Sequence, residues 1–338
     1  NHAGQRGVRF AQELSVMGKP VIYIMCLQNH VEDEVRRIDD NTISYPLSWF
    51  ISISWEIISS PLLDMKRKVM LFQVSFYHAF EMISYANAHG WTTVYDIVDD
   101  WEGFYHENFI AEYDRELERY VAANSDVLVA VNHSLRDKFK DFGDIALIPN
   151  GYSPRLLNSG KPKNLKRGTI TAGFFGHLHQ ARFNWDLLIK TAEIQKDWMF
   201  YIIGFGEPSG LVLPENVVKV GPIDPSGLSA YAKNWDVALI PYQYNELCKK
   251  LNPIKIFEYL YFGLPIVATG CEDVKNYPYS FYASKEEEFI GLIEKASMTT
   301  VEQEKIRSLL QEATWEYRVQ QLLDVIESRN NYKSVCTD

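Results

Sequence analysis

Short apolar runs and amphipathic segments alternate along the whole chain. Within residues 5–17, Val8, Ala11 and Leu14 follow helical spacing, and the apolar run 21–25 comes soon afterwards. Such runs are typical of buried strands in a parallel sheet, connected by helices. The pattern therefore predicts an α/β protein with Rossmann-like, doubly wound parallel sheets.

Further strands are predicted on both sides of one polar segment. Residues 153–167 are rich in Lys, Pro, Ser and Asn, which is typical of a linker between domains. The length of 338 residues also favours two domains of ordinary size, here 1–152 and 168–314. Besides 21–25, the expected strands are 94–98, 126–131 and 145–148 in the first domain, and 170–175, 199–203, 217–220, 237–240 and 266–268 in the second.

Residues 252–269 combine a capped helix with a buried strand. Asn252 is a natural N-cap, Pro253 suits the first helical position, and Gly263 can end the helix in a left-handed conformation. The apolar run 266–268 then predicts a parallel strand. The sequence thus predicts both ends of this helix.

Lys255 and Glu258 share one face of that helix near its N-terminus, because they are three residues apart. A cation, a carboxylate and the positive end of a helix dipole suit a ligand that carries phosphate and hydroxyl groups. An ion pair on a solvated surface is the alternative that the spacing allows.

Charge and cysteine content narrow the classes of function. A formal net charge of -10 argues against a nucleic-acid partner and against simple adsorption to anionic lipid, although the basic residues 66–68 leave a local membrane contact open. The 4 cysteines form no CxxC pair, which indicates reduced thiols in a cytoplasmic protein and no thiolate zinc site. The apolar segment 45–63 is interrupted by Glu56 and prolines, so it reads as core packing or as a contact with lipid or acceptor.

Three stretches in a fixed order carry a resemblance to a known family. They are residues 125–152, the Phe-Phe-Gly-His-Leu run 174–178, and residues 236–269. Together they resemble retaining glycosyltransferases of the GT-B fold, in the family-4-type group of bacterial envelope and polysaccharide enzymes. Residues 5–24 and 94–101 are similar to one branch of that group.

The resemblance implies two Rossmann-like domains that face a cleft, with the helix 315–338 crossing back to the N-terminal domain. The implied reaction moves a hexosyl or deoxyhexosyl group from a nucleotide-diphosphate donor to a hydroxyl of a glycan or glycolipid, with retention, in surface polysaccharide synthesis. The implied donor site lies in the C-terminal domain and the acceptor site in the N-terminal one. Neither a metal nor another cofactor is expected, and peripheral contact with the inner face of the membrane stays open.

Five residues are carried over to the donor site. In this family frame, Glu258 would accept hydrogen bonds from the ribose hydroxyls, and Lys255 and Arg182 would bind the diphosphate. Gly204 and Gly206 would let the backbone approach the nucleotide, although a Gly-x-Gly run also occurs in plain turns.

The chain departs from the family pattern just before the helix. Many members have two glutamates eight residues apart, and Lys250 stands at the first of these positions, while Glu258 matches the second. Asn245, Lys249 or Asn252 would then take over the contact with the transferred sugar.

The strand 94–98 ends in two candidates for the chemistry of transfer. Asp99 or Asp100 would orient the acceptor hydroxyl or accept its proton, and adjacent side chains of an extended chain point to opposite sides. Helix capping or an ion pair is the alternative for both. In the loop after the strand 170–175, His177 or His179 would face the donor.

The first six residues, Asn-His-Ala-Gly-Gln-Arg, look like the loop that follows the first strand of a doubly wound domain. We therefore expect the natural protein to extend further toward its N-terminus. Within that loop, Gly4 and Arg6 would lie near the donor phosphates or the acceptor.

Three other functions stay open at this point. A metal-dependent glycosyltransferase of another fold would use Asp99 and Asp100 to bind Mn²⁺, but the donor signature lies far from that pair in the sequence. A nucleotide-sugar epimerase would share the fold. A non-catalytic scaffold that binds a nucleotide or glycan stays open because of the departure at Lys250.

Overall fold

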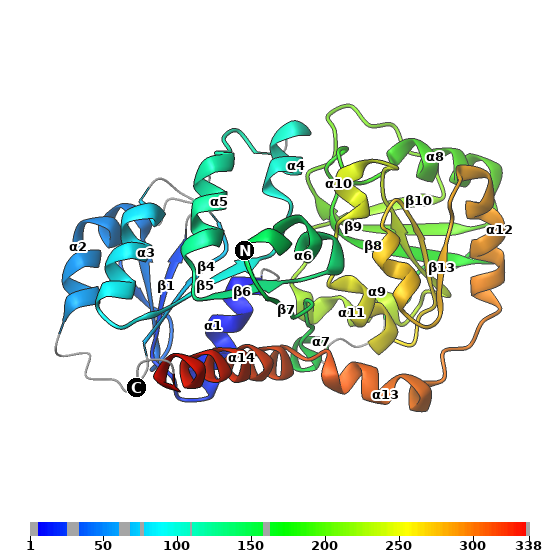
Figure 1. The fold of residues 1–338 in the computed structure, drawn as a ribbon. Coiled ribbons are helices and arrows are strands. Elements are labelled where there is room, and N and C mark those ends of the chain that lie inside the picture. The colour runs from blue at the N-terminus through cyan, green and yellow to red at the C-terminus, as the bar shows by residue number, and fades with distance from the viewer. Residues whose placement is uncertain are drawn as a thin grey trace. The chain divides into compact units, whose positions relative to one another are not determined.

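The computed structural model describes residues 6–25, 34–60, 68–74, 78–108, 110–157 and 163–335. Contacts divide the chain into two compact units, coloured along the sequence in Figure 1. Unit 1 consists of Asn1–Glu102, Glu112–Pro149 and Trp315–Asp338, and unit 2 of Gly103–Ala111 and Asn150–Thr314. No helix in these described ranges is long and apolar enough to cross a membrane.

Unit 1 contains a parallel sheet in the order β4-β5-β6-β7 and a smaller sheet in the order β1-β3-β2. The strands expected at 21–25, 94–98, 126–131 and 145–148 are confirmed as β1, β5, β6 and β7. Three strands were not predicted from the sequence: β2 and β3 lack a continuous apolar run, whereas the apolar run of β4 was overlooked. The bounds are β1 Val21–Met25, β2 Arg36–Arg37, β3 Thr42–Pro46, β4 Val69–Phe72, β5 Thr92–Ile97, β6 Val127–Ala130 and β7 Ile145–Leu147.

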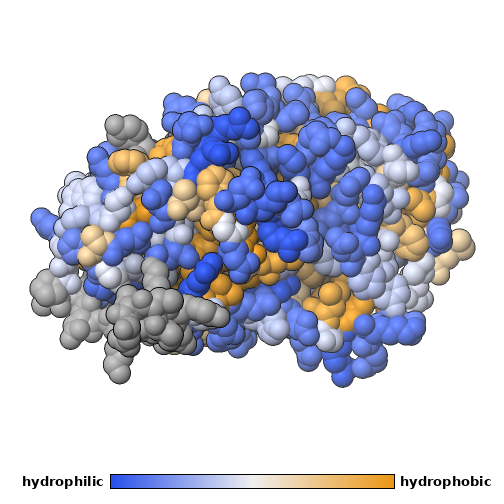
Figure 2. Space-filling view, in the orientation of Figure 1, coloured by the Kyte–Doolittle hydropathy of each residue, from blue (hydrophilic) through white to orange (hydrophobic). Residues whose placement is uncertain are grey.

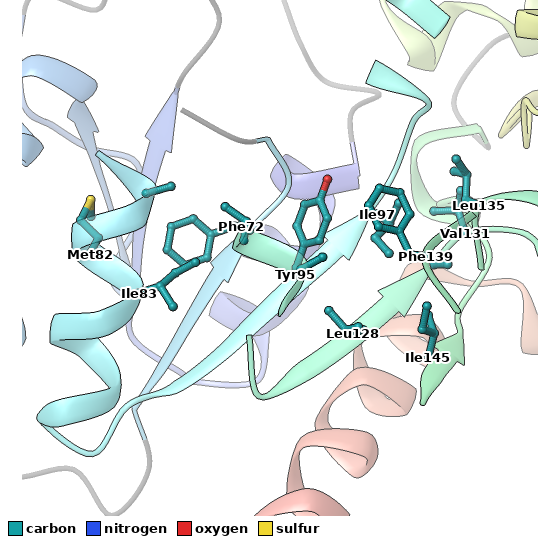
Figure 3. Close-up of a cluster of buried hydrophobic side chains, with 14 of the residues drawn as sticks. Phe72, Met82, Ile83, Tyr95, Ile97, Leu128, Val131, Leu135, Phe139 and Ile145 are labelled. Carbon is teal, nitrogen blue, oxygen red and sulfur yellow. The ribbon is translucent and has the colours of Figure 1, made fainter. Parts of the chain in front are cut away.

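Helices pack their apolar faces against the larger sheet of unit 1. In Figure 3, Met82 and Ile83 come from one helix and Phe139 from another, and Tyr95 and Leu128 lie on the strands between them. Burial of these large side chains is the main stabilising term of the unit. Its helices are α1 Arg6–Val16, α2 Leu47–Ser59, α3 Ala79–Ala88, α5 Arg115–Asn124, α6 His133–Phe139, the 3₁₀ turn Lys140–Phe142 and α14 Trp315–Val335.

Most of the described part of the apolar segment 45–63 forms helix α2, and its burial distinguishes core packing from a contact with lipid or acceptor. Phe50 and Ile58 are buried, and Trp55 packs against the core cluster. Its exposed positions are three serines, Glu56 and Trp49, and the surface over α2 in Figure 2 is largely hydrophilic or intermediate. The structure therefore supports core packing rather than an apolar contact face.

Helix α14 belongs to unit 1, although it follows the last residue of unit 2 in the sequence. It starts at Trp315, the residue at which the family resemblance puts the crossing. The Trp315 ring packs edge-on against Phe10 of α1, with ring centroids 5.9 Å apart. The two helices lie against each other in Figure 1.

Unit 2 is a six-stranded parallel sheet in the order β10-β9-β8-β11-β12-β13. The five strands expected from apolar runs are confirmed, and β13 is added at one edge. Relative to their order in the sequence, the chain runs outward from β8 in one direction and then in the other, as in a Rossmann fold. The strands are β8 Thr171–His177, β9 Met199–Phe205, β10 Val217–Gly221, β11 Val237–Pro241, β12 Ile266–Thr269 and β13 Ser280–Tyr282.

The division between the units falls slightly before the predicted linker 153–167. Unit 2 resumes at Asn150, and helix α7 already occupies Pro154–Leu157. Helix α4, Trp101–His106, contributes its first two residues to unit 1 and the rest to unit 2. The remaining helices of unit 2 are α8 Trp185–Ile194, α9 Ser229–Ala232, α10 Glu246–Lys249, α11 Lys255–Tyr261, α12 Glu286–Ser297 and α13 Gln303–Glu312, with 3₁₀ turns at Pro225–Gly227 and Glu272–Asn276.

The start of α11 differs from its prediction. The helix begins at Lys255 with Ile254 as the flanking residue, so Asn252 is not its N-cap and Pro253 is not its first residue. The Asn252 side chain instead accepts a hydrogen bond from the backbone N–H of Asn150 at 3.0 Å. A long-range contact therefore displaces the local capping interaction that the sequence favours.

The end of α11 agrees with its prediction. Gly263 has φ +77°, and its N–H donates to the carbonyl of Leu260 at 2.9 Å. The Leu264 N–H donates to Tyr259 at 2.9 Å, which completes a Schellman motif. A glycine is required here because residues with a side chain are strained in this conformation.

Replacing Gly263 by alanine is expected to lower the free energy of unfolding by about 1–2 kcal/mol, because alanine is strained at positive φ. Gly291 in the middle of α12 is the matched control, since no atom lies within 4 Å of a Cβ placed there. Gly291→Ala is expected to raise stability by about 0.5–1 kcal/mol. Urea unfolding measures both variants, and an unchanged midpoint for Gly263→Ala would contradict the strain argument.

Candidate functional site

The strand order of unit 2 points to one end of its sheet. Ligands of open α/β sheets bind at the carboxyl ends of the strands, where the strand order reverses. Here the reversal lies between β8 and β11, which end at His177 and Pro241. The loops that leave these strands and β9 are therefore where a ligand is expected.

Glycines bring the loops after β8 and β9 into close contact. A Cβ at Gly204 would lie 1.8 Å from the carbonyl oxygen of Gly176. One at Gly176 would lie 3.2 Å from Lys255 Nζ, and one at Gly206 would lie 2.8 Å from His177 Cε1. Four residues from the predicted donor set, Gly204, Gly206, Lys255 and His177, thus meet at this end of the sheet.

The ammonium of Lys255 is held by aromatic residues. Its Nζ donates a hydrogen bond to the hydroxyl of Tyr242 at 2.6 Å. It also lies 5.1 Å from the centroid of the Phe174 ring and 5.2 Å from that of Tyr242. The positive charge is therefore held beside the ends of β8 and β11. The hydrogen bond to Tyr242 uses one of the three N–H donors of the ammonium.

Arg182 lies in the loop between β8 and α8. Its backbone is fixed by hydrogen bonds of 3.0 Å to the His179 carbonyl and 2.8 Å from the Gln243 N–H. Its guanidinium lies 4.6 Å over the ring of Phe104, from the short segment of unit 2 before Asn150. Arg182 and Lys255 give this end of the sheet a positive potential, which suits an anionic ligand.

The positive groups also act on His177. Burial, together with the charges of Arg182, His179 and Lys255, lowers the pKa of His177 to about 4, and burial is the largest of these causes. Near neutral pH this ring is therefore uncharged.

Glu258, one turn after Lys255 in α11, is half-buried.

Two asparagines of the predicted donor set hold loops together. Asn245 caps α10 by accepting from the Cys248 N–H at 2.8 Å, and its amide N–H donates to Ala181 at 3.0 Å. Asn252 donates to Asp273 at 2.6 Å and also accepts from the backbone N–H of Asn150. Both amides thus have structural partners, and Lys250 is the residue that follows α10.

In unit 1, Asp100 is engaged in an ion pair. It is 4% exposed, and its Oδ1 accepts a hydrogen bond from Lys138 Nζ at 2.6 Å. Lys138 also pairs with Glu102 at 3.1 Å. Burial opposes the charge of Lys138, but the hydrogen bond and charge of Asp100 outweigh burial and raise the pKa of Lys138. The ion-pair interpretation therefore holds for Asp100, while Asp99 is partly exposed.

Arg6 is likewise held inside unit 1. Its Nε donates to Asp96 Oδ2 at 2.7 Å, and its Nη1 donates to the Pro149 carbonyl at 2.9 Å. Gln73 donates to the same Asp96 oxygen at 2.7 Å. Sequence analysis missed Asp96, although a charged residue inside an apolar strand was a signal for a buried pair. Gly4 lies outside the described residues.

A second buried acid was also missed. Glu118 accepts hydrogen bonds from Tyr95 and Tyr113, both at 2.7 Å. Burial raises the pKa of Glu118, while the two tyrosine hydroxyls and the charge of Lys138 lower it. Glu118 lies on the helical face of α5 that packs inward, so spacing alone would have marked the position as core.

The depressed pKa of His177 makes stability depend on pH. The unfolded histidine takes up a proton near pH 6.5 and the folded one only near 4, so the free energy of unfolding falls as the pH drops between these values. For this partly exposed group we expect a loss of about 1–2 kcal/mol.

Urea unfolding of wild type and His177→Gln at several pH values between 4 and 7 measures this loss as their difference. The exposed His133 is the control, since His133→Gln should retain the full pH dependence. An identical pH dependence in wild type and His177→Gln would disprove the assignment.

Comparison with known proteins bears on unit 2 in particular. Residues 169–290 match the family model described as Glycosyl transferases group 1. A relative named for teichuronic acid biosynthesis, the glycosyltransferase TuaH of Bacillus subtilis (strain 168), is 29% identical over 166 residues, which are 44% of this chain. The chain spans only 41% of the length of that relative.

Solved structures show the same fold at low sequence identity. The α,α-trehalose 6-phosphate synthase from Burkholderia multivorans has a TM-score of 0.62 at 10% identity, over 98% of this chain and 95% of its own. An S. aureus TarM mutant in complex with Fondaparinux, alpha-GlcNAc-glycerol and UDP has a TM-score of 0.51 at 13% identity, over 76% of this chain and 55% of its own. The chain thus has the GT-B fold of these glycosyltransferases, and its residues 169–290 are similar to glycosyl transferases group 1.

Proposed function

We propose that the protein transfers a sugar from a nucleoside diphosphate donor to a hydroxyl of a glycan or glycolipid, in the synthesis of a bacterial surface polysaccharide. One observation carries the proposal: the cationic, glycine-lined end of β8 and β9 in the domain that matches group 1 glycosyl transferases. The role named for TuaH supports the polysaccharide context.

The donor would be bound by residues that meet at this end of unit 2. Lys255 and Arg182 would neutralise the negative charge that grows on the leaving diphosphate as the glycosidic bond breaks. Gly204 and Gly206 would let the nucleotide approach the backbone, and the carboxylate of Glu258 would accept hydrogen bonds from two ribose hydroxyls. Because the TarM structure holds UDP, uridine is the first nucleoside to test.

The reaction would need no metal, because fixed cations occupy the role that Mg²⁺ or Mn²⁺ has in other phosphoryl sites. Retention of the anomeric configuration is part of the proposal, and NMR of fresh product tests it. The protein would act in the cytoplasm, with a peripheral contact to the inner face of the membrane through the basic residues 66–68.

Two alternatives give different products. An epimerase would convert the sugar of the donor without an acceptor. A transferase would move the unchanged sugar to the acceptor and release the nucleoside diphosphate. A scaffold would bind the nucleotide sugar without converting it. Chromatography of the nucleotide sugar, incubated with and without a glycan acceptor, separates the three functions.

Lys255→Met is expected to weaken binding of a nucleoside diphosphate at least tenfold, because it removes a charge-assisted hydrogen bond but keeps the packing of the stem. A ligand at a hundred times its dissociation constant should stabilise wild type by about 2.7 kcal/mol, which thermal unfolding detects. The matched control is Lys305→Met, a surface lysine paired with Glu302. If no nucleoside diphosphate stabilises wild type, the donor site is wrong.

We propose that Asp99, rather than Asp100, meets the acceptor hydroxyl. Asp99→Asn is then expected to lower kcat about 100-fold or more, with nucleotide binding unchanged. Asp100→Asn should instead lower the free energy of unfolding by about 1–3 kcal/mol, because Lys138 loses the charge beside it. Steady-state kinetics and urea unfolding of both variants measure the two effects, and the reverse pattern would exchange the two roles.

A further inference from the structure

Two histidines follow β8, and both accept a hydrogen bond of the same kind. The backbone N–H of His179 donates to Nδ1 of His177 at 3.3 Å. The backbone N–H of Ala181 donates to Nδ1 of His179 at 3.2 Å. Each ring thus accepts from the amide two residues further on, and the ring centroids lie 6.1 Å apart.

These hydrogen bonds determine which ring nitrogen carries the proton. A nitrogen that accepts a hydrogen bond uses its lone pair, so in the neutral imidazole the proton is on the other nitrogen. Both His177 and His179 are therefore N–H donors at Nε2. Metal coordination through Nε2 requires the opposite tautomer, in which Nδ1 carries the proton and both backbone bonds are lost.

The surroundings of His177 favour its neutral form. Arg182, His179 and Lys255 are the titratable or charged groups that act on it, and all three oppose a further positive charge. The Phe205 ring packs edge-on against it, with ring centroids 5.0 Å apart, and a Cβ at Gly206 would lie 3.0 Å from its Nε2. The donor edge of the ring thus lies against the glycine turn after β9.

We propose that His177 binds the donor diphosphate as a neutral N–H donor through Nε2, while Lys255 and Arg182 supply the positive charge. This inference rests on the proposed function, since it assigns a binding mode to that donor site. Hydrogen-bond donation and positive charge come from different residues, because a protonated imidazole in this loop would be repelled by Lys255 and Arg182. Donor binding should then take up no proton.

Titration calorimetry with UDP-glucose between pH 6 and 8 tests this binding mode. A nucleotide sugar is the right probe because its two phosphates are esterified and do not titrate in this range. For a neutral His177 we expect less than about a twofold change in affinity and no dependence of the heat on the buffer. If binding instead required a charged imidazole, the affinity would rise by up to about tenfold for each unit by which the pH falls. Close to one proton would then be taken up on binding.

Variants separate the neutral donor from other roles of the ring. His177→Gln places an amide N–H near the position of Nε2 and should keep affinity within about threefold. His177→Ala should lose about tenfold or more. The matched control is the exposed His133, whose glutamine variant should bind like wild type. Wild-type affinity in His177→Ala would overturn the inference and leave the donor site standing.

A second measurement does not depend on the ligand or on variants. Long-range ¹H–¹⁵N NMR spectra of the histidine-labelled protein report the tautomer of each ring directly. Both loop histidines are expected with the proton on Nε2, and a proton on Nδ1 of His177 would overturn the inference. If UDP-glucose and a panel of other nucleotide sugars all fail to bind wild type, the proposed function fails first, and this binding mode fails with it.

Discussion

The close approach of two backbones at the ends of β8 and β9 is the constraint on which the site in unit 2 depends. Gly204 can lie against the carbonyl of Gly176 only because it has no Cβ. This approach keeps the two strands paired to their last residues, Gly176 with Gly204 and His177 with Phe205. The loops that follow are therefore held together at the point where the strand order reverses.

Aromatic rings and histidine hydrogen bonds then set the charge of this end of the sheet. Lys255 is positioned by Tyr242 and Phe174 rather than by a carboxylate, so its charge is not cancelled by those two neighbours. The pKa of His177 is lowered by burial and by cations. The result is two positive charges and an uncharged His177 at this end of the sheet, which suits an anionic ligand.

Unit 1 uses its charged residues differently. Arg6 and Asp96 form a pair inside the unit, and Asp100 is paired with Lys138. Breaking either pair would leave a charge without compensation in a poorly solvated place, so these residues are costly to change for reasons of stability alone. Two of the charged groups of this unit that sequence analysis assigned to ligands, Arg6 and Asp100, thus also form ion pairs within the unit.

The sequence by itself determined most of the parallel strands and the end of α11. Continuous apolar runs can only be buried on both faces, and Gly263 needs no partner from elsewhere to stop a helix. Only the tertiary structure decided the start of α11, the partners of Arg6, Asp96 and Asp100, and the hydrogen bonds that orient His177 and His179. Those depend on which distant groups are brought within about 3 Å, and short-range spacing carries no information on that.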